Sequence, residues 1–228
     1  MTISKILGRI LVGIAATFAL ATPAQAALQA RDLNGDTVTD AYFDTDRNIT
    51  WLRDANVNGR MTWAAANTWA AGYSIGIYDD WRLPTVVQPD AACENSFDAG
   101  GSIGIQSFGF NCTGSEMGHL WYTELGNTAG SFTNDGDFLN MQSGVYWSGA
   151  EFAPSPDGAW GVGANVGSQH AFNKNGQLYA MAVRPGDVRA AQVPEPESLL
   201  LALTGLGALA LVRRRTNSGR RCHGSTCG

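Results

Sequence analysis

The sequence predicts an α+β domain of two helices and short antiparallel strands, with a signal peptide before it and a C-terminal transmembrane helix after it. Three observations predict this class. Two stretches have the apolar spacing and capping residues of helices, several short strand-like runs are separated by Gly, Asn and Pro, and an apolar segment lies near each end of the 228-residue chain. No repeat with a period of about 20 to 50 residues is present, so a solenoid or propeller is not expected.

Residues 1–26 predict a secretory signal peptide. Lys5 and Arg9 precede an apolar run from Ile10 to Leu20, and the small-x-small triplet Ala24-Gln25-Ala26 follows it. We expect cleavage after Ala26, because the apolar run is short for a membrane span that stays in place. Export then leaves residues 27–190 as one folded domain outside the cytoplasm.

A hairpin and a helix are predicted in the first part of the domain. Residues 37–52 have two runs that suit strands, divided by the turn-prone stretch at 44–48. Thr62 can cap a helix over 63–70, which is rich in alanine and stops at Gly72.

The second part of the domain predicts another helix and several strands. The helix runs from Ser115 to about Leu125 and ends at Gly126. Residues 90–112 between the two helices are expected to be mostly loop. Short strands are predicted after Gly144, at 145–148, 159–162 and 178–184.

Four cysteines fall into two pairs. We predict a disulfide between Cys93 and Cys112, because both lie in the exported domain, where thiols oxidise. Cys222 and Cys227 are expected to stay reduced in a cytoplasmic tail. With only His223 nearby, that second pair is too small a donor set to predict a metal site.

The stretch DLNGDTVTD at residues 32–40 is a candidate calcium loop. Asp32, Asn34, Asp36 and Asp40 take positions 1, 3, 5 and 9 of an EF-hand-like loop, and oxygen ligands at this spacing suit Ca²⁺. Position 6 is Thr37 where glycine is usual, and position 12 is Phe43 in place of a bidentate glutamate. The alternative is an Asx-rich turn before a strand. No other cofactor is expected.

Other polar residues of the domain have structural interpretations. Asp79, Asp80 and Arg82 surround Trp81; we expect Trp81 in the core and Arg82 paired with a carboxylate, rather than a polar site beside an aromatic platform. His119 is expected to be a satisfied structural histidine. No catalytic motif with a serine, cysteine or histidine nucleophile or base is present, so no catalytic residue is predicted.

Charge limits the partners of the domain. Residues 27–193 contain eight Lys and Arg against 18 Asp and Glu, a net charge of −10. Nucleic acid, anionic lipid and sulfated polysaccharide would be repelled, while cations and neutral polysaccharide remain suitable partners. Most of the seven tryptophans should be core, and an exposed aromatic ring beside Asn and Asp would indicate a glycan site.

The C-terminal segment carries a motif, an apolar run and a basic cluster in succession. The motif is Val193-Pro194-Glu195-Pro196, the apolar run is 199–212, and the cluster is Arg213, Arg214 and Arg215. Length alone favours a buried core helix, since 14 helical residues rise about 21 Å, whereas the hydrocarbon core of a bilayer is about 30 Å thick. The prolines and the arginines favour a short transmembrane helix whose C-terminal end lies in the cytoplasm.

Residues 191–228 therefore resemble the PEP-CTERM sorting signal of Gram-negative bacteria. The resemblance implies recognition by exosortase, a membrane protease-transpeptidase, and transfer from the inner membrane to the cell surface or extracellular matrix. The chain departs from the pattern by continuing from Thr216 to Gly228 after the arginines.

The domain resembles the DUF1566 family, which is named after the C-terminal domain of a collagen-like adhesin, Lcl. Six segments occur in the family's order: NITWLRDAN, MTWAAANTWAAG, YDDWRLPT, SEMGHLWYTELGN, VYWSGAEF and YAMAVRPG. The block WRLPT is also similar to sulfatase-modifying-factor domains, which implies a C-type-lectin-like fold. The adhesin's sulfated ligand does not suit a domain of this charge, and the cysteines do not match those of the sulfatase-modifying enzymes.

Two functions are consistent with these features, and a third alternative is a purely structural role that would show neither ligand binding nor turnover. The first is an exported surface or biofilm-matrix protein whose lectin-like domain binds or scaffolds extracellular material without catalysis. The second is a secreted enzyme that acts on envelope or matrix polysaccharide, for which 18 acidic residues allow many chance carboxylate pairs.

Overall fold

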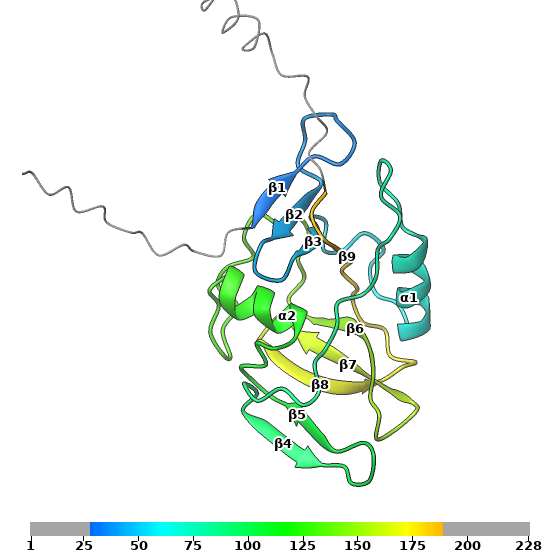
Figure 1. Ribbon diagram of the computed structural model, residues 1–228, viewed down its shortest axis with the longest axis vertical. Helices are drawn as coiled ribbons and strands as arrows, with labels where there is room; N and C mark the ends of the chain where they lie inside the picture. Colours follow the sequence, from blue (N-terminus) through cyan, green and yellow to red (C-terminus); the bar gives the residue numbers. More distant parts are fainter. Residues whose placement is uncertain (1–27, 189–228) are drawn as a thin grey trace, which may run out of the picture.

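Four antiparallel strands form a sheet that contains both ends of the described chain. The computed structural model describes residues 28–188, and the strands of this sheet lie in the order β1-β2-β3-β9. Their bounds are Gln29–Arg31 for β1, Ala41–Asp44 for β2, Ile49–Leu52 for β3 and Val183–Pro185 for β9. The first and last strands therefore lie at the same end of the molecule (Figure 1).

The β2–β3 hairpin confirms the hairpin predicted within residues 37–52. Asp44 pairs with Ile49 across the ladder, so that residues 45–48 form the turn. Oδ1 of Asp44 accepts hydrogen bonds from the backbone N–H groups of Asp46 and Arg47, at 3.1 and 2.9 Å. These Asx-type bonds fix the turn that the Asp-rich sequence predicts.

A second antiparallel sheet, of order β6-β7-β8, forms the middle of the molecule (Figure 1). β6 is Val145–Glu151, β7 is Gly158–Gly163 and β8 is Ser168–Asn173. The strands predicted at 145–148 and 159–162 are confirmed within β6 and β7. β8 was not predicted, because its sequence SQHAFN is largely polar and only Gln169 is buried along it.

The strand predicted at 178–184 is wrong over most of its length. Only the last two of its residues belong to β9, while Leu178 and Tyr179 form single bridges to Met61 and Tyr146. This segment passes from one sheet to the other, so its backbone changes partner every few residues instead of extending one ladder.

Both predicted helices are present. α1 spans Trp63–Gly72, and the hydroxyl of Thr62 accepts a hydrogen bond from the backbone N–H of Ala65, as expected of its cap. α2 spans Glu116–His119 and continues into a π-helical turn, η1, at Leu120–Glu124. Leu125 donates its backbone N–H to the carbonyl of Leu120, five residues back, at 2.9 Å.

A third sheet, of two strands, corrects the expectation that residues 90–112 are mostly loop. β4, Asn95–Asp98, pairs with β5, Ile105–Phe108, in an antiparallel hairpin. The Gly-rich connection at 99–104 and the polar residues of both strands predict a loop. In the structure, Gly109 pairs with Gln169 of β8 and fixes the hairpin to the central sheet. This hairpin lies at the opposite end of the molecule from β1 (Figure 1).

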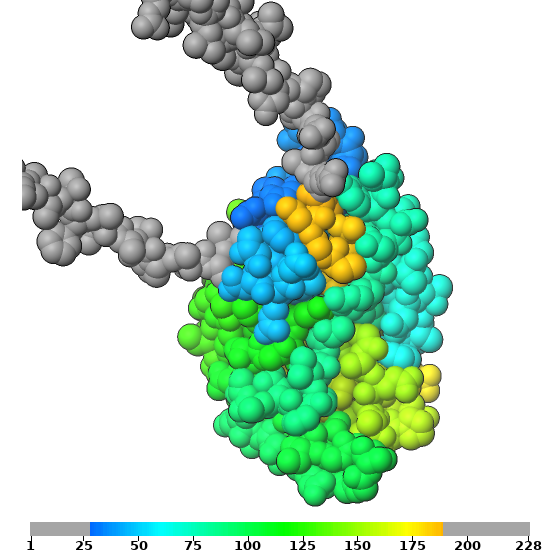
Figure 2. Space-filling model, viewed as in Figure 1, coloured from blue at the N-terminus to red at the C-terminus, as the bar shows by residue number. Residues whose placement is uncertain are grey.

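The core lies between the two larger sheets and the helices. The prediction that most tryptophans are core residues is confirmed: five are buried, and Trp63 and Trp69 are partly buried. The five buried rings are Trp51, Trp81, Trp121, Trp147 and Trp160. Figure 2 shows the residues next to the C-terminal end of the described chain, in orange, packed against the blue residues of the first sheet.

Several predictions fall outside the described residues. These are the signal peptide, the sorting motif at 193–196, the transmembrane helix at 199–212, the arginines at 213–215 and the cysteines at 222 and 227. Within residues 28–188, no helix has the length and apolar character needed to cross a bilayer. The described domain is thus an α+β arrangement of small antiparallel sheets with two short helices.

Candidate functional site

The predicted calcium loop brings its carboxylates together. Oxygen atoms of Asp32, Asp36 and Asp40 lie within 4.8 Å of one another on an exposed loop. Asp32 accepts backbone N–H groups on both oxygens, from Gly35 at 2.7 Å on Oδ1 and from Thr37 at 2.7 Å on Oδ2. The loop therefore has the oxygen cluster of a cation site and, equally, the hydrogen bonds of an Asx-rich turn.

Position 6 of this loop adopts the backbone conformation that the calcium motif requires. Thr37 has φ 72°, in the left-handed region where glycine is usual. Partial desolvation alone would raise the pKa of Asp32, but the backbone N–H groups of Thr37, Gly35, Asn34 and Asp36 lower it below its ordinary value. Asp32 is therefore held in its charged form.

Arg82 pairs with a carboxylate, as the sequence predicts, and the partner is Glu116. Nη1 and Nη2 of Arg82 donate to Oε2 and Oε1 of Glu116 at 2.8 and 2.7 Å. The backbone N–H of Thr85 donates to Oε2 as well, at 2.7 Å. Because Trp81 and Leu83 are buried, this block joins the start of α2 to the chain before it and is structural.

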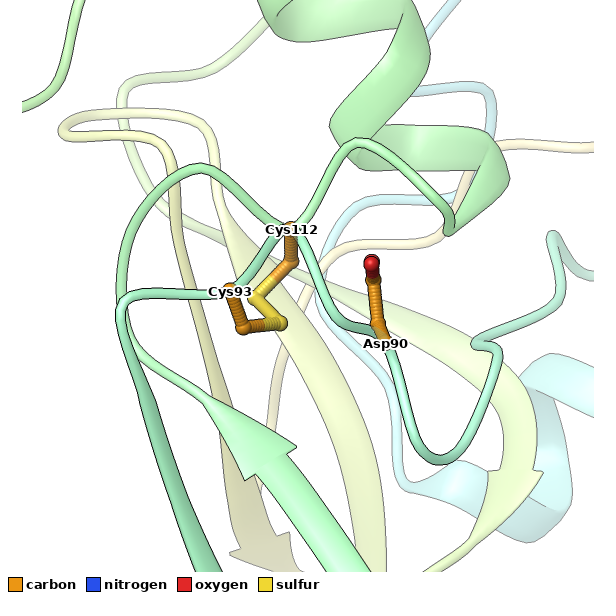
Figure 3. A group of neighbouring side chains, drawn as sticks. All are labelled: Asp90, Cys93 and Cys112. Atoms are coloured by element: carbon orange, nitrogen blue, oxygen red, sulfur yellow. A yellow bond between two sulfur atoms is a disulfide. The ribbon is translucent and has the colours of Figure 1, made fainter.

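Cys93 and Cys112 form the predicted disulfide (Figure 3). Asp90 lies beside them and accepts backbone hydrogen bonds from Ala92 and Gly114, at 2.9 and 2.8 Å. Both sulfur atoms are bonded to each other, so this group has no thiolate with which to bind a metal. The disulfide closes the base of the β4–β5 hairpin.

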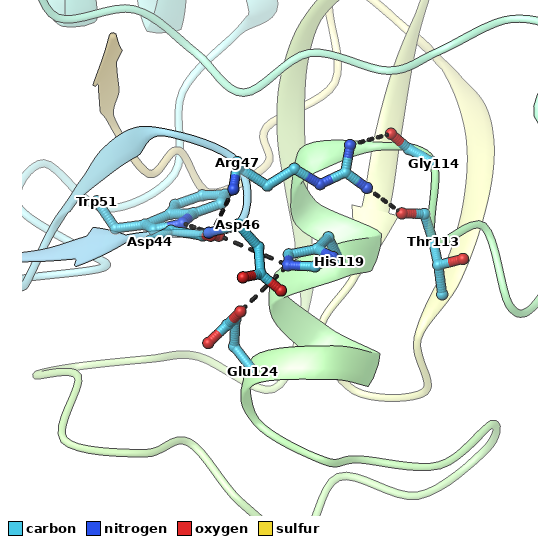
Figure 4. A network of polar contacts seen from close by, with 8 residues as sticks. All are labelled: Asp44, Asp46, Arg47, Trp51, Thr113, Gly114, His119 and Glu124. Atoms are coloured by element: carbon cyan, nitrogen blue, oxygen red, sulfur yellow. Dashed lines mark hydrogen bonds and ion pairs between the residues drawn. The ribbon is translucent and has the colours of Figure 1, made fainter. Parts of the chain in front are cut away.

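A buried polar cluster was not predicted from the sequence. Asp44 at the end of β2, His119 at the end of α2 and Glu124 in η1 point their side chains toward one another (Figure 4). Nε2 of His119 lies 3.1 Å from Oε1 of Glu124 and 3.9 Å from Oδ2 of Asp44. Two carboxylates thus face one imidazole nitrogen.

The π-helical turn explains why His119 and Glu124 meet. In an α-helix, residues five apart diverge by about 140° around the axis. A turn whose hydrogen bonds join residues five apart places them close to one face instead. Apolar spacing cannot reveal such a turn, which is why the sequence indicated only a structural role for His119.

Burial shifts the protonation of this cluster. Burial raises the pKa of Glu124 to about 7, and the charges of Asp44 and Asp46 add to the rise. Burial also lowers the pKa of His119; Asp44 and Asp46 oppose this effect, while Arg47 adds to it. Arg47 faces the cluster from the turn after β2 and donates to the carbonyl oxygens of Thr113 and Gly114 (Figure 4).

One exposed aromatic ring has the surroundings expected of a glycan site. Phe97 of β4 is 40% exposed, and the residues beside it on this strand, including Asn95 and Asp98, are exposed as well. Asn95 shares a face of the strand with Phe97, because side chains two residues apart point the same way.

A core cavity of about 10 Å³ beside Trp121 is large enough only for a water molecule.

Comparison with known families identifies two matches. The family model of the Lcl C-terminal domain matches residues 40–184. The PEP-CTERM protein-sorting motif matches residues 192–215. No curated protein matches the chain significantly. The first match contains Asp44, His119 and Glu124, whereas the first three ligands of the candidate calcium loop precede it.

Proposed function

This chain belongs to the Lcl C-terminal domain family and carries a PEP-CTERM sorting motif. We propose that its domain binds neutral polysaccharide at the bacterial surface. The motif implies export, processing by exosortase and sorting to the cell envelope or surface of a Gram-negative bacterium. Binding or scaffolding without catalysis, and a place in a biofilm matrix, are the further parts of the proposal.

The position of the hairpin supports the binding role. β1 and β9 belong to one sheet, so the chain enters and leaves the domain at one end. The segment that matches the PEP-CTERM model, residues 192–215, begins only four residues after the last described residue, Val188. A domain attached through that end would direct the β4–β5 hairpin, at the opposite end, away from the membrane (Figure 1).

The chemistry of the hairpin supports a neutral sugar as ligand. The ring of Phe97 is held against Phe108 and Phe152, with centroids 6.1 and 6.4 Å away, so it is positioned to stack on a sugar ring. Asn95 can hydrogen-bond to hydroxyl groups from the same face of β4. The acidic character of the domain disfavours sulfated or otherwise anionic chains.

A glycan array and a hydrolysis screen with the full-length protein test the binding role. Phe97→Ala should weaken binding to the best glycan about tenfold, equivalent to about 1.4 kcal/mol. Ile105→Ala is the matched control, since Ile105 is an exposed apolar residue of the same hairpin without a ring, and it should leave affinity unchanged. Equal losses in both variants would contradict stacking on Phe97. Turnover abolished by one carboxylate substitution would instead establish a polysaccharide-degrading enzyme.

Sorting is tested by expressing the full-length chain with and without exosortase and following release of its tail. Glu195→Ala, within the motif, should block tail removal. Glu197→Ala changes the same residue type two positions later, outside the Val193–Pro196 motif, and should be processed normally. Processing of both variants at equal rates would oppose recognition through this motif. We also propose that the signal peptide at 1–26 directs export and is removed after Ala26, and that the transmembrane helix at 199–212 then holds the chain in the inner membrane before this step.

Calcium binding by the loop at 32–40 is a second property that we propose. The cluster of three carboxylates and the left-handed conformation of Thr37 support it. Without a ligand at position 12, affinity in the millimolar range of extracellular modules is expected. Calorimetry should show Ca²⁺ uptake that Asp36→Ala removes, and absence of heat at millimolar Ca²⁺ would leave the Asx-rich turn as the correct interpretation. We further propose a C-type-lectin-like fold for the domain.

A further inference from the structure

We propose that Asp44, His119 and Glu124 bind one divalent transition-metal ion of the Zn²⁺ type inside the domain. The site is separate from the surface hairpin and from the calcium loop, so it goes beyond the function proposed above. It follows from the geometry of the three side chains, from an unpaired buried oxygen and from the way the ligands are held.

The ligand atoms are spaced almost as an ion requires. Bonds of about 2.0 to 2.1 Å from zinc to nitrogen and oxygen place tetrahedral ligands about 3.3 Å apart. Nε2 of His119 lies 3.1 Å from Glu124 and 3.9 Å from Asp44, and one atom from each of the three residues falls within a 4.8 Å group. Shifts of less than about 1 Å would complete the coordination.

The polar groups of this cluster are not satisfied by one another. A neutral imidazole has at most one N–H at Nε2, and this nitrogen faces two carboxylates. The side chain of Glu124 is 1% exposed, and within residues 28–188 no group donates a hydrogen bond to its buried Oε2. An unpaired buried carboxylate oxygen is costly, and a cation bound by both oxygens of Glu124 would remove that cost.

The ligands are also oriented by their surroundings, as in known metal sites. Oδ1 of Asp44 is occupied by the backbone N–H groups of Asp46 and Arg47, which leaves Oδ2 to face His119. Nε1 of Trp51 lies 3.5 Å from Oδ2 and limits its movement (Figure 4). Such outer contacts fix ligand direction and support affinity.

The donor set selects the class of ion. One imidazole and two carboxylates suit Zn²⁺, Mn²⁺ or Fe²⁺ better than Ca²⁺, which prefers oxygen alone, and no thiolate belongs to the group. Asp44 is fully buried and His119 nearly so, which prevents access by a polymeric substrate. The ion would therefore join β2 to the α2–η1 helix and stabilise the fold.

Titration of the chelator-stripped full-length chain with Zn²⁺ tests this site, with millimolar Ca²⁺ present to saturate oxygen-only sites. The wild type should bind one Zn²⁺, and its unfolding temperature should rise by about 5 to 10 °C when Zn²⁺ exceeds the Kd about 100-fold. Glu124→Gln should weaken binding at least about 100-fold. His170→Gln changes an exposed histidine of the same domain and should bind as the wild type does.

Stability without metal separates a ligand from a structural residue. Glu124→Gln removes a buried charge that lacks full pairing, so the metal-free variant should unfold at the wild-type temperature or above it. Absence of tight Zn²⁺ binding by the wild type, or equal binding by Glu124→Gln, would overturn the proposal.

Cobalt substitution of the wild type gives a second measurement that needs no variant. Co²⁺ in this site should show ligand-field bands without thiolate charge-transfer absorption. Thiolate bands alone would place the ion on Cys222 and Cys227 and overturn the proposal as well.

Discussion

Substituting Glu116 by glutamine should destabilise the domain by about 2 kcal/mol. Its Oε2 accepts two hydrogen bonds, from Arg82 and Thr85, and its Oε1 accepts one from Arg82. A glutamine oxygen can replace Oε2, but its amino group then faces Nη2 of Arg82 as donor against donor. Breaking a buried ion pair costs about 3 to 5 kcal/mol. We expect less, because 36% of the Arg82 side chain is exposed and water can hydrate part of it.

A second bidentate pair in the same domain is the matched control for this substitution. Arg184 donates to Asp80 at 2.6 and 3.0 Å, but 45% of the Asp80 side chain is exposed, against 11% for Glu116. The Arg184 side chain is only 11% exposed, but it also donates to the carbonyl oxygen of Asp187 and lies over the ring of Tyr78, so Asp80→Asn should still cost less than about 1 kcal/mol. Urea denaturation followed by tryptophan fluorescence measures both changes, and Glu116→Gln should lower the midpoint by about 1 M. Equal losses in the two variants would refute the argument from burial.

Three further predictions concern the backbone and the disulfide. Gly118→Ala should destabilise the domain by more than about 3 kcal/mol, because the added Cβ would lie 1.9 Å from the carbonyl oxygen of Cys112. Gly72→Ala is the control, since Gly72 ends α1 in open space, and this change should be neutral or stabilising. Thermal denaturation measures both variants. Thr37→Gly should raise the free energy of unfolding by about 0.5 to 1 kcal/mol by relieving φ 72°, and a loss of stability would show that the threonine is not strained. Removing the disulfide by Cys93→Ala with Cys112→Ala should cost about 3 kcal/mol for a sequence separation of 19, measured by the same denaturation; an unchanged midpoint would show that the hairpin does not depend on it.

Features with local signals could be predicted from the sequence. The cap at Thr62, the turn after Asp44 and the stop at Gly126 each act within a few residues, and the helices and first hairpin follow from them. The disulfide was predictable because Cys93 and Cys112 are the cysteines of the exported part. The carboxylate partner of Arg82 was expected, although its identity required the fold.

Features that depend on distant contacts could not be predicted. β4 and β8 are polar strands whose pairing is supplied by other parts of the chain, so their own residues carry little strand signal. The buried cluster joins Asp44 to His119 and Glu124, which lie 75 and 80 residues later in the sequence, and only the π-helical turn brings the last two onto one face. The only sign of the cluster in the sequence is a histidine five residues before a glutamate. In an α-helix this spacing places the two side chains on different faces, so it does not predict a contact.

The placement of β9 beside β3 has a consequence for translocation. A chain that emerges amino end first presents β1, β2 and β3 early, but the ladder at Trp51 stays open until Val183 arrives. Residues 178–183 also form backbone bridges to Met61, Arg82 and Tyr146. The last part of the domain to be exported therefore pairs with three earlier regions of the chain. Folding of the domain should therefore be completed only after residues 178–185 have been exported, a few residues before the sorting motif begins.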